Sequence, residues 1–423
     1  MPLQKMDGEV PENGSEKSGA VSYDLLPSHN EKTFNSMKAP CAVKRINFRI
    51  SEANPGDKLN VHVPKLSKNE VLVPSSLALR FDIDLSGGHA NNFLVQNVSR
   101  ALLSQLVVKF GGTMLDEIDY YDIYKIFTDL FLPEEKRGNM VAEGIQSKDL
   151  CKIRSGAGDK PTSGVDAEKK LQEIYGKKYR INLDHQIYTD HGVFYPKALY
   201  TDLVFEVALT PASQVVKGSD PTKLKYKLTN IQLEYEMIRS EELANQATSK
   251  YIRAKKFLYD HVTRLRVEPI DKSHPLINIK VHTQRRSMKG ILLVEPYAAG
   301  ARDSEKFVFP YLKKVKVTIN GSPNMLYKEG IESMDAWTQV SRFFMKEKIK
   351  PQHMTKQKFY TENKFGLLID LRSMASQEMH GSGTRFVNTT DRVQLEIRRA
   401  KGSGNMAKVC QFCFRRHKHS HCS

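Results

Sequence analysis

One order of elements occurs in both halves of this chain, and it limits the folds that the chain can adopt. Leu106–Phe131 begins with an apolar run, continues through a double glycine and ends in a helical pattern. Val315–Phe344 begins with an alternating run, continues through an Asn-Gly turn and also ends in a helical pattern. The repetition predicts two copies of one β-rich domain.

Short alternating runs surround both of these stretches. Leu77–Leu85, Leu203–Leu209 and Leu228–Met237 alternate in the first half, and Leu276–His282 and Arg392–Ile397 alternate in the second. Alternation is typical of half-buried antiparallel strands, and the chain lacks the strand–helix–strand rhythm of a parallel sheet. The fold class that we predict is all-β with a few helices: two tandem antiparallel eight-stranded jelly-roll β-sandwiches.

The ends of the two halves also look alike. Phe365–Leu371 resembles Leu203–Leu209 in type and in place, and Arg392–Ile397 resembles Ile231–Tyr235, with Gln-Leu-Glu in both. We therefore interpret Arg392–Ile397 as the final strand of the second half.

Composition changes predict the domain boundaries. Residues 1–41 form a flexible polar N-terminal arm, 42–239 the first jelly roll, and 240–257 a linker helix. Residues 258–400 form the second jelly roll, and 401–423 a basic C-terminal tail rich in Cys and His.

Two features between the strands could cover sheet edges within the chain. Pro133–Lys178 is a long polar stretch that we interpret as an exposed excursion from the fold. The helical pattern at Ile331–Phe344 carries Trp337, which is expected to pack in the core or at a subunit interface.

Charge is distributed unevenly along the chain. Residues 1–250 carry 32 Lys and Arg against 33 Asp and Glu, a net charge of −1, whereas residues 251–423 carry 33 against 15, a net charge of +18. The basic half predicts either a surface that faces a polyanion such as DNA or a solvated face without a dedicated partner.

Composition also argues against several classes of protein. No apolar run has the roughly 18–20 residues of a membrane-spanning helix, and the N-terminus lacks a secretory signal. The five cysteines are scattered except near residue 410, which argues against a disulfide scaffold. We found no phosphate-binding loop or nucleophile elbow and predict that the protein is not an enzyme.

The stretch 409–423 carries the remaining candidate site residues. Cys410 and Cys413 form a C-x-x-C pair, and with His417 and either His421 or Cys422 they could supply the four ligands of a zinc ion. The alternative, which we favour, is a flexible basic tail in which these residues are incidental. No cofactor is otherwise expected.

The same stretch contains candidate nucleic-acid contacts. Residues 401–423 include five Lys and Arg and no acidic residue, and the candidates are Arg415, Arg416 and Lys418.

The chain resembles a known family, the double jelly-roll major capsid proteins of DNA viruses. The resemblance is carried by Leu72–Leu85, Ser104–Leu130 and Tyr200–Leu209, whose amino-acid sequences are similar to those of uncharacterised invertebrate proteins of Polinton/Maverick virus-like elements. It covers roughly residues 42–400.

The resemblance implies a structural capsid-like protein that assembles as pseudo-hexagonal trimers into a shell. The implied partners are further copies of the chain, other capsid proteins such as a penton-like protein, and DNA, and the implied location is the virion, the cytoplasm or the nucleus rather than the secretory route. Two alternatives stay open: a nucleic-acid-binding protein of a mobile element, and a minor capsid or lectin-like β-sandwich protein.

Overall fold

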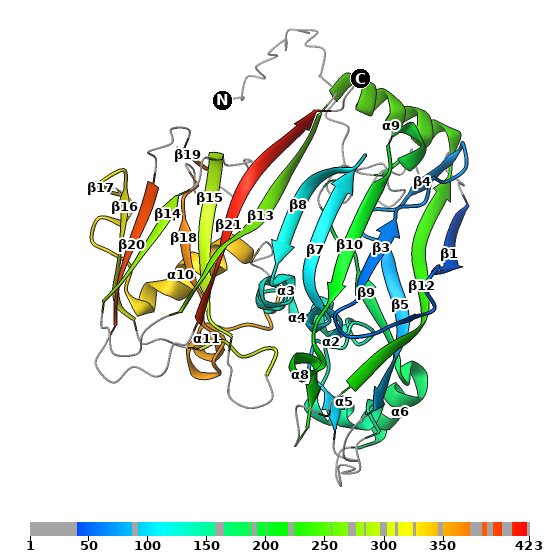
Figure 1. The fold of residues 1–423 in the computed structure, drawn as a ribbon, viewed down its shortest axis with the longest axis horizontal. Coiled ribbons are helices and arrows are strands. Elements are labelled where there is room, and N and C mark those ends of the chain that lie inside the picture. Colours follow the sequence, from blue (N-terminus) through cyan, green and yellow to red (C-terminus); the bar gives the residue numbers. More distant parts are fainter. Residues whose placement is uncertain are drawn as a thin grey trace, which may run out of the picture.

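The computed structural model places two β-sandwiches side by side (Figure 1). It describes residues 40–86, 92–156, 165–185, 187, 193–199, 201–218, 223, 225–254, 256–269, 276–282, 285–296, 303–308, 312–324, 327–345, 350–372, 383–386, 392–399 and 408–420. Nearly all of the arm expected at residues 1–41 lies outside this part of the chain.

The first sandwich consists of two antiparallel sheets. One sheet has the order β1-β12-β5-β9, with the short β2 and β4 also paired to β12, and the other has the order β3-β10-β7-β8. A small separate sheet pairs β6 with β11. The strand bounds are Cys41–Asn47 (β1), Glu52–Ala53 (β2), Lys58–His62 (β3), Glu70–Leu72 (β4), Ala78–Ser86 (β5), Phe93–Leu94 (β6), Leu103–Phe110 (β7), Thr113–Asp119 (β8), Lys178–Asn182 (β9), Leu203–Leu209 (β10), Val216–Lys217 (β11) and Lys225–Arg239 (β12).

The second sandwich has the same two-sheet plan. One sheet has the order β13-β21-β15-β18, with β19 paired to β15, and the other has the order β14-β20-β16-β17. The strand bounds are Lys256–Pro269 (β13), Leu276–His282 (β14), Arg285–Val294 (β15), Leu312–Ile319 (β16), Ser322–Pro323 (β17), Leu367–Asp370 (β18), Thr384–Phe386 (β19), Arg392–Arg399 (β20) and Lys408–Ser420 (β21).

The two sandwiches correspond strand for strand. The eight principal strands are β1, β3, β5, β7, β8, β9, β10 and β12 in the first, and β13, β14, β15, β16, β17, β18, β20 and β21 in the second. In both, one sheet contains the first, eighth, third and sixth of these strands, and the other contains the second, seventh, fourth and fifth. This is the jelly-roll arrangement, so the predicted fold class is confirmed.

Alternating side chains explain why these segments form sandwiches. In β10 every second residue from Leu203 to Leu209 is buried, and the residues between them are only partly buried. Because successive side chains on a strand point to opposite faces, such a strand places one apolar face on a core. The buried apolar residues of both sandwiches form one continuous cluster.

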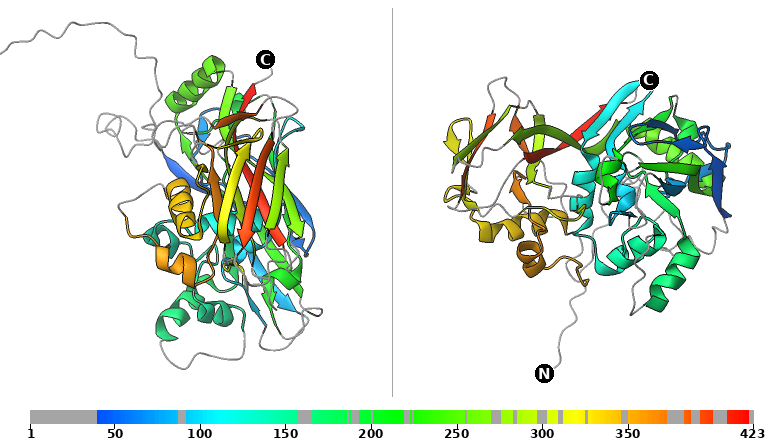
Figure 2. Two further views of the ribbon diagram at one scale, coloured as in Figure 1. Left: turned by 90° about the vertical axis from the view of Figure 1, so that its left-hand side faces the viewer. Right: turned by 60° about the horizontal axis from the view of Figure 1, so that its bottom comes forward.

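Helices occupy the connections between strands, and α6, α10 and α11 lie to one side of the two sandwiches (Figure 2). The helix bounds are Val98–Ala101 (α2), Tyr121–Asp129 (α3), Glu134–Gly138 (α4), Lys148–Arg154 (α5), Val165–Tyr175 (α6), Pro196–Ala198 (η2, a 3-10 helix), Ala212–Val215 (α8), Glu241–Ala254 (α9), Ser333–Phe344 (α10) and Lys356–Thr361 (α11). In the described part of the chain, no helix is long and apolar enough to span a membrane.

The stretch 133–178 is more ordered than its polar composition indicated. It contains α4, α5 and α6, and its buried residues include Leu150 and Cys151. Ser147 caps α5, because its side chain accepts a hydrogen bond from the backbone N–H of Leu150 at 3.1 Å. The expectation of an exposed excursion was wrong for α4 and α5, which contribute buried residues, whereas residues 167–175 of α6 are exposed or only partly buried.

The C-terminal boundary also differs from the expectation. Residues 408–420 are not a tail: they form β21, which pairs with β13 on one side and β15 on the other. The Arg392–Ile397 segment lies in β20, the seventh strand, and Phe365–Leu371 overlaps β18, the sixth. The sequence comparison matched each of them to a strand of the first sandwich that comes one place later in the order. The reason is that β21, the true eighth strand, has the basic composition of a tail and becomes a strand only by pairing within its sheet.

The helix expected at residues 240–257 is present as α9. Leu243, Ala244 and Ala247 are buried, and the Ser240 hydroxyl accepts a hydrogen bond from the backbone N–H of Leu243 at 3.3 Å. The helix connects β12, the eighth strand of the first sandwich, with β13, the first strand of the second.

Candidate functional site at the junction of the two sandwiches

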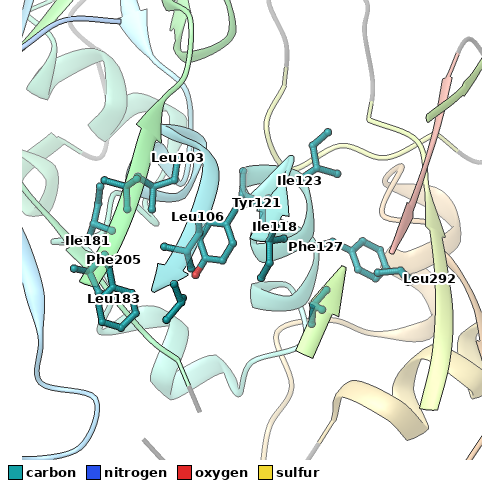
Figure 3. Close-up of a cluster of buried hydrophobic side chains, with 14 of the residues drawn as sticks. Leu103, Leu106, Ile118, Tyr121, Ile123, Phe127, Ile181, Leu183, Phe205 and Leu292 are labelled. Atoms are coloured by element: carbon teal, nitrogen blue, oxygen red, sulfur yellow. The ribbon is translucent and has the colours of Figure 1, made fainter. Parts of the chain in front are cut away.

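The junction joins unlike sides of the two sandwiches. Strand β8 of the first sandwich lies beside β13 of the second, and α3, which follows β8, faces the second sandwich (Figure 1). Phe127 on α3 is directed towards Leu292 on β15 (Figure 3). The sequence predicts one helix in each half, and these two helices, α3 and α10, contact each other through Phe127 and Phe344.

Buried charge holds α3 in place on the first sandwich. Arg100 on α2 is 2% exposed, and its Nε donates to the Asp129 carboxylate at the end of α3 at 3.1 Å. Its Nη1 donates to the carbonyl of Asn182 at 3.0 Å. Because α3 is fixed at its C-terminal end, Phe127 and Phe131 have defined positions in the junction.

Aromatic rings fill the centre of the junction. Phe127 is fully buried and packs edge-on against Phe307 and Phe344 of the second sandwich, with centroid distances of 5.2 and 6.0 Å. Phe131 stacks on Phe344 at 5.8 Å and contacts Trp337 at 6.3 Å. Offset and edge-on pairs at these distances add to the stabilisation from burial, and Trp337 packs within the chain, as one of its expected roles required.

A glycine allows this close approach. A Cβ at Gly366 would lie 2.4 Å from Cζ of Phe127 and 3.1 Å from Cγ1 of Val294. Those distances are shorter than a carbon–carbon contact allows. Gly366 precedes β18, so the backbone of the second sandwich reaches the Phe127 ring only because no side chain stands between them.

A buried carboxylate connects the sandwiches between β8 and β13. The Asp116 carboxylate on β8 lies 2.9 Å from Nδ1 of His261 on β13 and 3.4 Å from Nε2 of His185. All three residues are less than 9% exposed. The backbone N–H of Ile187 donates to Nδ1 of His185 at 3.2 Å, so the proton of a neutral His185 ring sits on Nε2 and points to Asp116.

The two imidazoles decide the protonation of this carboxyl group. Burial raises the pKa of Asp116, but the hydrogen bonds from His185 and His261 outweigh it, so the pKa lies below its usual value. Asp116 is therefore a carboxylate at neutral pH, and the interactions that stabilise it come from both sandwiches.

A second buried ion pair connects α4 of the first sandwich with the second sandwich. Arg137 at the end of α4 donates to the Glu305 carboxylate of the second sandwich, and both residues are nearly inaccessible to water. Lys364 Nζ donates to the carbonyl of Glu305 at 2.7 Å and lies 3.7 Å from its carboxylate. Burial, together with nearby Arg137, lowers the pKa of His353 to about 4.

Backbone contacts extend the junction at its edges. The backbone N–H of Glu134 donates to the carbonyl of Pro351 at 3.0 Å, and the Tyr259 hydroxyl donates to the carbonyl of Leu115 at 3.3 Å. The junction therefore combines apolar packing, buried charge and backbone hydrogen bonds. Its chemistry is that of a permanent interface, which holds two domains in one relative position.

The candidate residues from the sequence lie elsewhere. Cys410, Cys413 and His417 belong to β21, and His421 lies outside the described residues. An extended strand rises about 3.3 Å per residue, so these positions are spread along β21, and zinc ligation by all of them requires the strand to leave its sheet. Within the described residues, no group of His, Cys, Asp or Glu is arranged to hold a metal ion. The zinc site stays a prediction.

The candidate nucleic-acid contacts also lie on β21. Arg415 pairs in register with His261 and Met288, Arg416 with Asp260, and Lys418 with Leu258. Their role in binding nucleic acid stays a prediction.

Sequence reasoning missed the residues of the junction, apart from Trp337. Asp116, His185 and His261 carry no sequence pattern that brings them together. The available signal was the aromatic residues of the two helical patterns, because Phe127 of the first and Phe344 of the second meet in the junction.

The fold and this junction together define a double jelly-roll protein. No protein-family model matches the chain, and no curated protein matches it. Solved structures do match. The major capsid protein of Faustovirus is similar over 91% of each chain, with a TM-score of 0.60 and 9% identity.

Two further structures are similar over nearly their whole length. The VP54 protein of the virus PBCV-1, fitted into a reconstruction of the virophage Sputnik, has a TM-score of 0.56 and 11% identity over 92% of this chain and 96% of that chain. A chain of the Sputnik virophage structure has a TM-score of 0.53 and 11% identity over 99% and 91%. At these identities the similarity shows the fold alone.

The aromatic junction predicts a specific cost for Gly366→Ala. The added methyl group overlaps the Phe127 ring, so the free energy of unfolding should fall by about 1–3 kcal/mol in urea titrations. Gly138→Ala is the matched control, because no atom lies within 4 Å of a Cβ at that position. Adding Phe127→Leu to Gly366→Ala should cost less than the sum of the two single changes, and equal midpoints for the two alanine variants would contradict the steric argument.

His353 predicts a pH dependence of stability. The unfolded chain binds a proton at His353 near pH 6.5, but the folded chain does so only near pH 4. The unfolded state therefore holds the extra proton between these values, and stability should decrease as pH falls from 6.5 towards 4. Urea unfolding at pH 7.5 and pH 5 should show a smaller loss for His353→Gln than for the wild type. Equal losses would show that His353 does not contribute.

Proposed function

We propose that the chain is a structural, non-enzymatic capsid-like protein that assembles as pseudo-hexagonal trimers into a shell. The observation that carries the proposal is the pair of topologically identical sandwiches, joined side by side through a buried junction. Three such chains provide six jelly rolls of similar shape, which gives the trimer a six-sided outline. Head-to-tail contacts between unlike faces of the chains close into a ring.

The similar structures support this proposal in a physical way. The Faustovirus protein is named as a major capsid protein, and the similarity covers at least 91% of this chain and of the Faustovirus and PBCV-1 VP54 chains. The shared feature is therefore the whole two-sandwich unit, which is the unit that a trimer requires.

The finer assignment rests on the sequence. The amino-acid sequences of residues 72–85, 104–130 and 200–209 support the origin of the protein in a virus-derived element of the Polinton/Maverick type. Further copies of the chain and a penton-like protein are the proposed protein partners, and the virion is the proposed location.

Solution mass tests the trimer. Light scattering of the full chain over a series of protein and salt concentrations should give three times the chain mass of 48.2 kDa, or larger closed particles. Negative-stain images of the trimer should show a six-sided outline. A monomer at all concentrations would contradict the proposal.

DNA is a second proposed partner, and the net charge of +18 in residues 251–423 supports it. Deleting residues 408–420 would remove a strand paired on both sides. Substitution is therefore the better test. Replacing Arg415, Arg416 and Lys418 with Gln should reduce the slope of log affinity against log salt by about 2.7, since each phosphate contact contributes about 0.9.

The matched control places the same number of changes in the first half. Lys148, Lys152 and Lys169 lie on α5 and α6, and their replacement with Gln should leave the slope unchanged. Affinity that does not depend on salt, or equal slopes for both triple variants, would exclude DNA binding through residues 415–418.

A further inference from the structure

The sheet that contains β14, β20 and β16 has a strongly basic outer face. These strands lie at the end of the molecule away from the first sandwich (Figure 1). Their inward residues are buried in the core, as Ile279, Leu395 and Val317 show. Because successive side chains on a strand point to opposite faces, the residues between them face outwards. The charged residues at the outward positions are Lys280 on β14, Arg392, Glu396 and Arg398 on β20, and Lys314 and Lys316 on β16.

Strand pairing brings these charges together. Lys314 lies opposite Arg398, Lys316 lies opposite Glu396, and Lys280 lies opposite Gln394. Neighbouring strands are about 4.8 Å apart and each residue rises about 3.3 Å, so the face measures about 10 by 20 Å. Five basic residues and one acidic residue share this area, which gives it a net charge of +4.

Little within the chain neutralises this charge. Nε of Arg398 donates to the Glu396 carboxylate at 2.9 Å. Within the described residues, this is the one ion pair that the six charged residues form. Lys280, Lys316 and Arg392 are exposed to solvent. Like charges on directly opposite positions of neighbouring strands destabilise a sheet, so the face carries an electrostatic cost that an anionic ligand would remove.

The corresponding face of the first sandwich shows that the fold does not require this charge. Strands β3, β10 and β7 occupy the places of β14, β20 and β16. Their outward charged residues are Lys58, Glu206 and Lys109, and the Glu206 carboxylate lies 3.3 Å from Nζ of Lys58 and 2.6 Å from Nζ of Lys109. A central carboxylate therefore pairs with both lysines. The unneutralised positive charge is a property of the second sandwich alone.

The other outward side chains indicate which polyanion fits. Asn278, Thr318 and Gln394 occupy outward positions between the basic residues, and none of the described outward positions holds Phe, Tyr or Trp. Proteins that bind single strands stack the bases on aromatic rings. Basic, amide and hydroxyl side chains instead contact phosphates and do not read the sequence. The face therefore has the chemistry to bind the backbone of a duplex.

We infer that the outer face of β14, β20 and β16 binds the phosphate backbone of duplex DNA without sequence preference. This inference rests on the proposed DNA partner and adds a second surface for it. Residues 415–418 belong to β21, which lies in the other sheet of the sandwich. The two surfaces can therefore be changed independently.

Lys280→Gln with Lys316→Gln tests the face in the full chain. Fluorescence anisotropy with a short DNA duplex of mixed sequence, at a series of salt concentrations, gives the slope of log affinity against log salt. The double variant should reduce this slope by about 1.8, since each phosphate contact contributes about 0.9. Both residues are exposed, so the urea midpoint should stay at the wild-type value.

The matched control changes the corresponding strands of the first sandwich. Lys58→Gln with Lys109→Gln removes two lysines from β3 and β7, and it should leave the slope unchanged because Glu206 neutralises that face. A second duplex of unrelated sequence should bind the wild type equally well, and the matching single strand should not bind more tightly. Tighter binding of the single strand would contradict the inference.

Glu396→Gln tests the same face by a gain of binding. The change removes the one acidic residue of the face and releases Arg398 from its ion pair. The slope should therefore increase by about 0.9, and the duplex should bind more tightly at low salt. A change that only disturbed the sheet would weaken binding. Unchanged or weaker binding by this variant would show that the face does not contact DNA.

The remaining outcomes separate this inference from the proposed function. If the wild type shows no salt-dependent binding of duplex DNA, the proposed DNA partner fails and the inference fails with it. If only the variant of Arg415, Arg416 and Lys418 lowers the slope, the DNA partner stands and the inference is wrong. If Lys280→Gln with Lys316→Gln leaves the slope unchanged but lowers the mass measured by light scattering, the face contacts another chain and the inference is also wrong.

Discussion

The packing of α3 against the second sandwich is the interaction on which the rest of the structure depends. Domains in one chain usually move relative to each other unless a large apolar interface joins them. Phe127 and Phe131 provide such an interface, because they insert between rings of the other sandwich and connect the two cores. These contacts therefore fix the position of one jelly roll relative to the other.

Buried charge makes this relation specific. Ion pairs taken out of water add little net stability, but breaking one by removing a partner costs about 3–5 kcal/mol. Asp116 contacts His185 of its own sandwich and His261 of the second sandwich. Glu305 of the second sandwich is paired with Arg137 of the first. A junction that slid by one residue would keep much of its apolar contact but would leave these carboxylates unpaired. The aromatic cluster thus supplies the attraction, and the charges select one alignment.

Local patterns in the sequence determined the parts of this structure that could be predicted. Alternation identified strands such as β10, and the repeated order of elements identified two domains. The helix α9 could be predicted because Ser240 stands at its start and Glu241 and Glu242 in its first turn. The misassigned β21 shows the limit: its basic residues and cysteines resemble a tail, and only pairing with β13 and β15 makes it a central strand. The junction could not be predicted because Asp116 and His261 are distant in sequence and meet only after both sandwiches have formed.

The position of β21 has a consequence for synthesis of the protein on the ribosome. The first sandwich has all its strands once Arg239 has been made, but the second lacks a central strand until residue 420 has emerged. Domains fold in order as they are synthesised. A nascent chain therefore displays a finished first sandwich with an uncovered Phe127 surface while β13 and β15 await the strand that belongs between them. During that interval the apolar residues of α3 that later pack on the second sandwich have no partner within the chain.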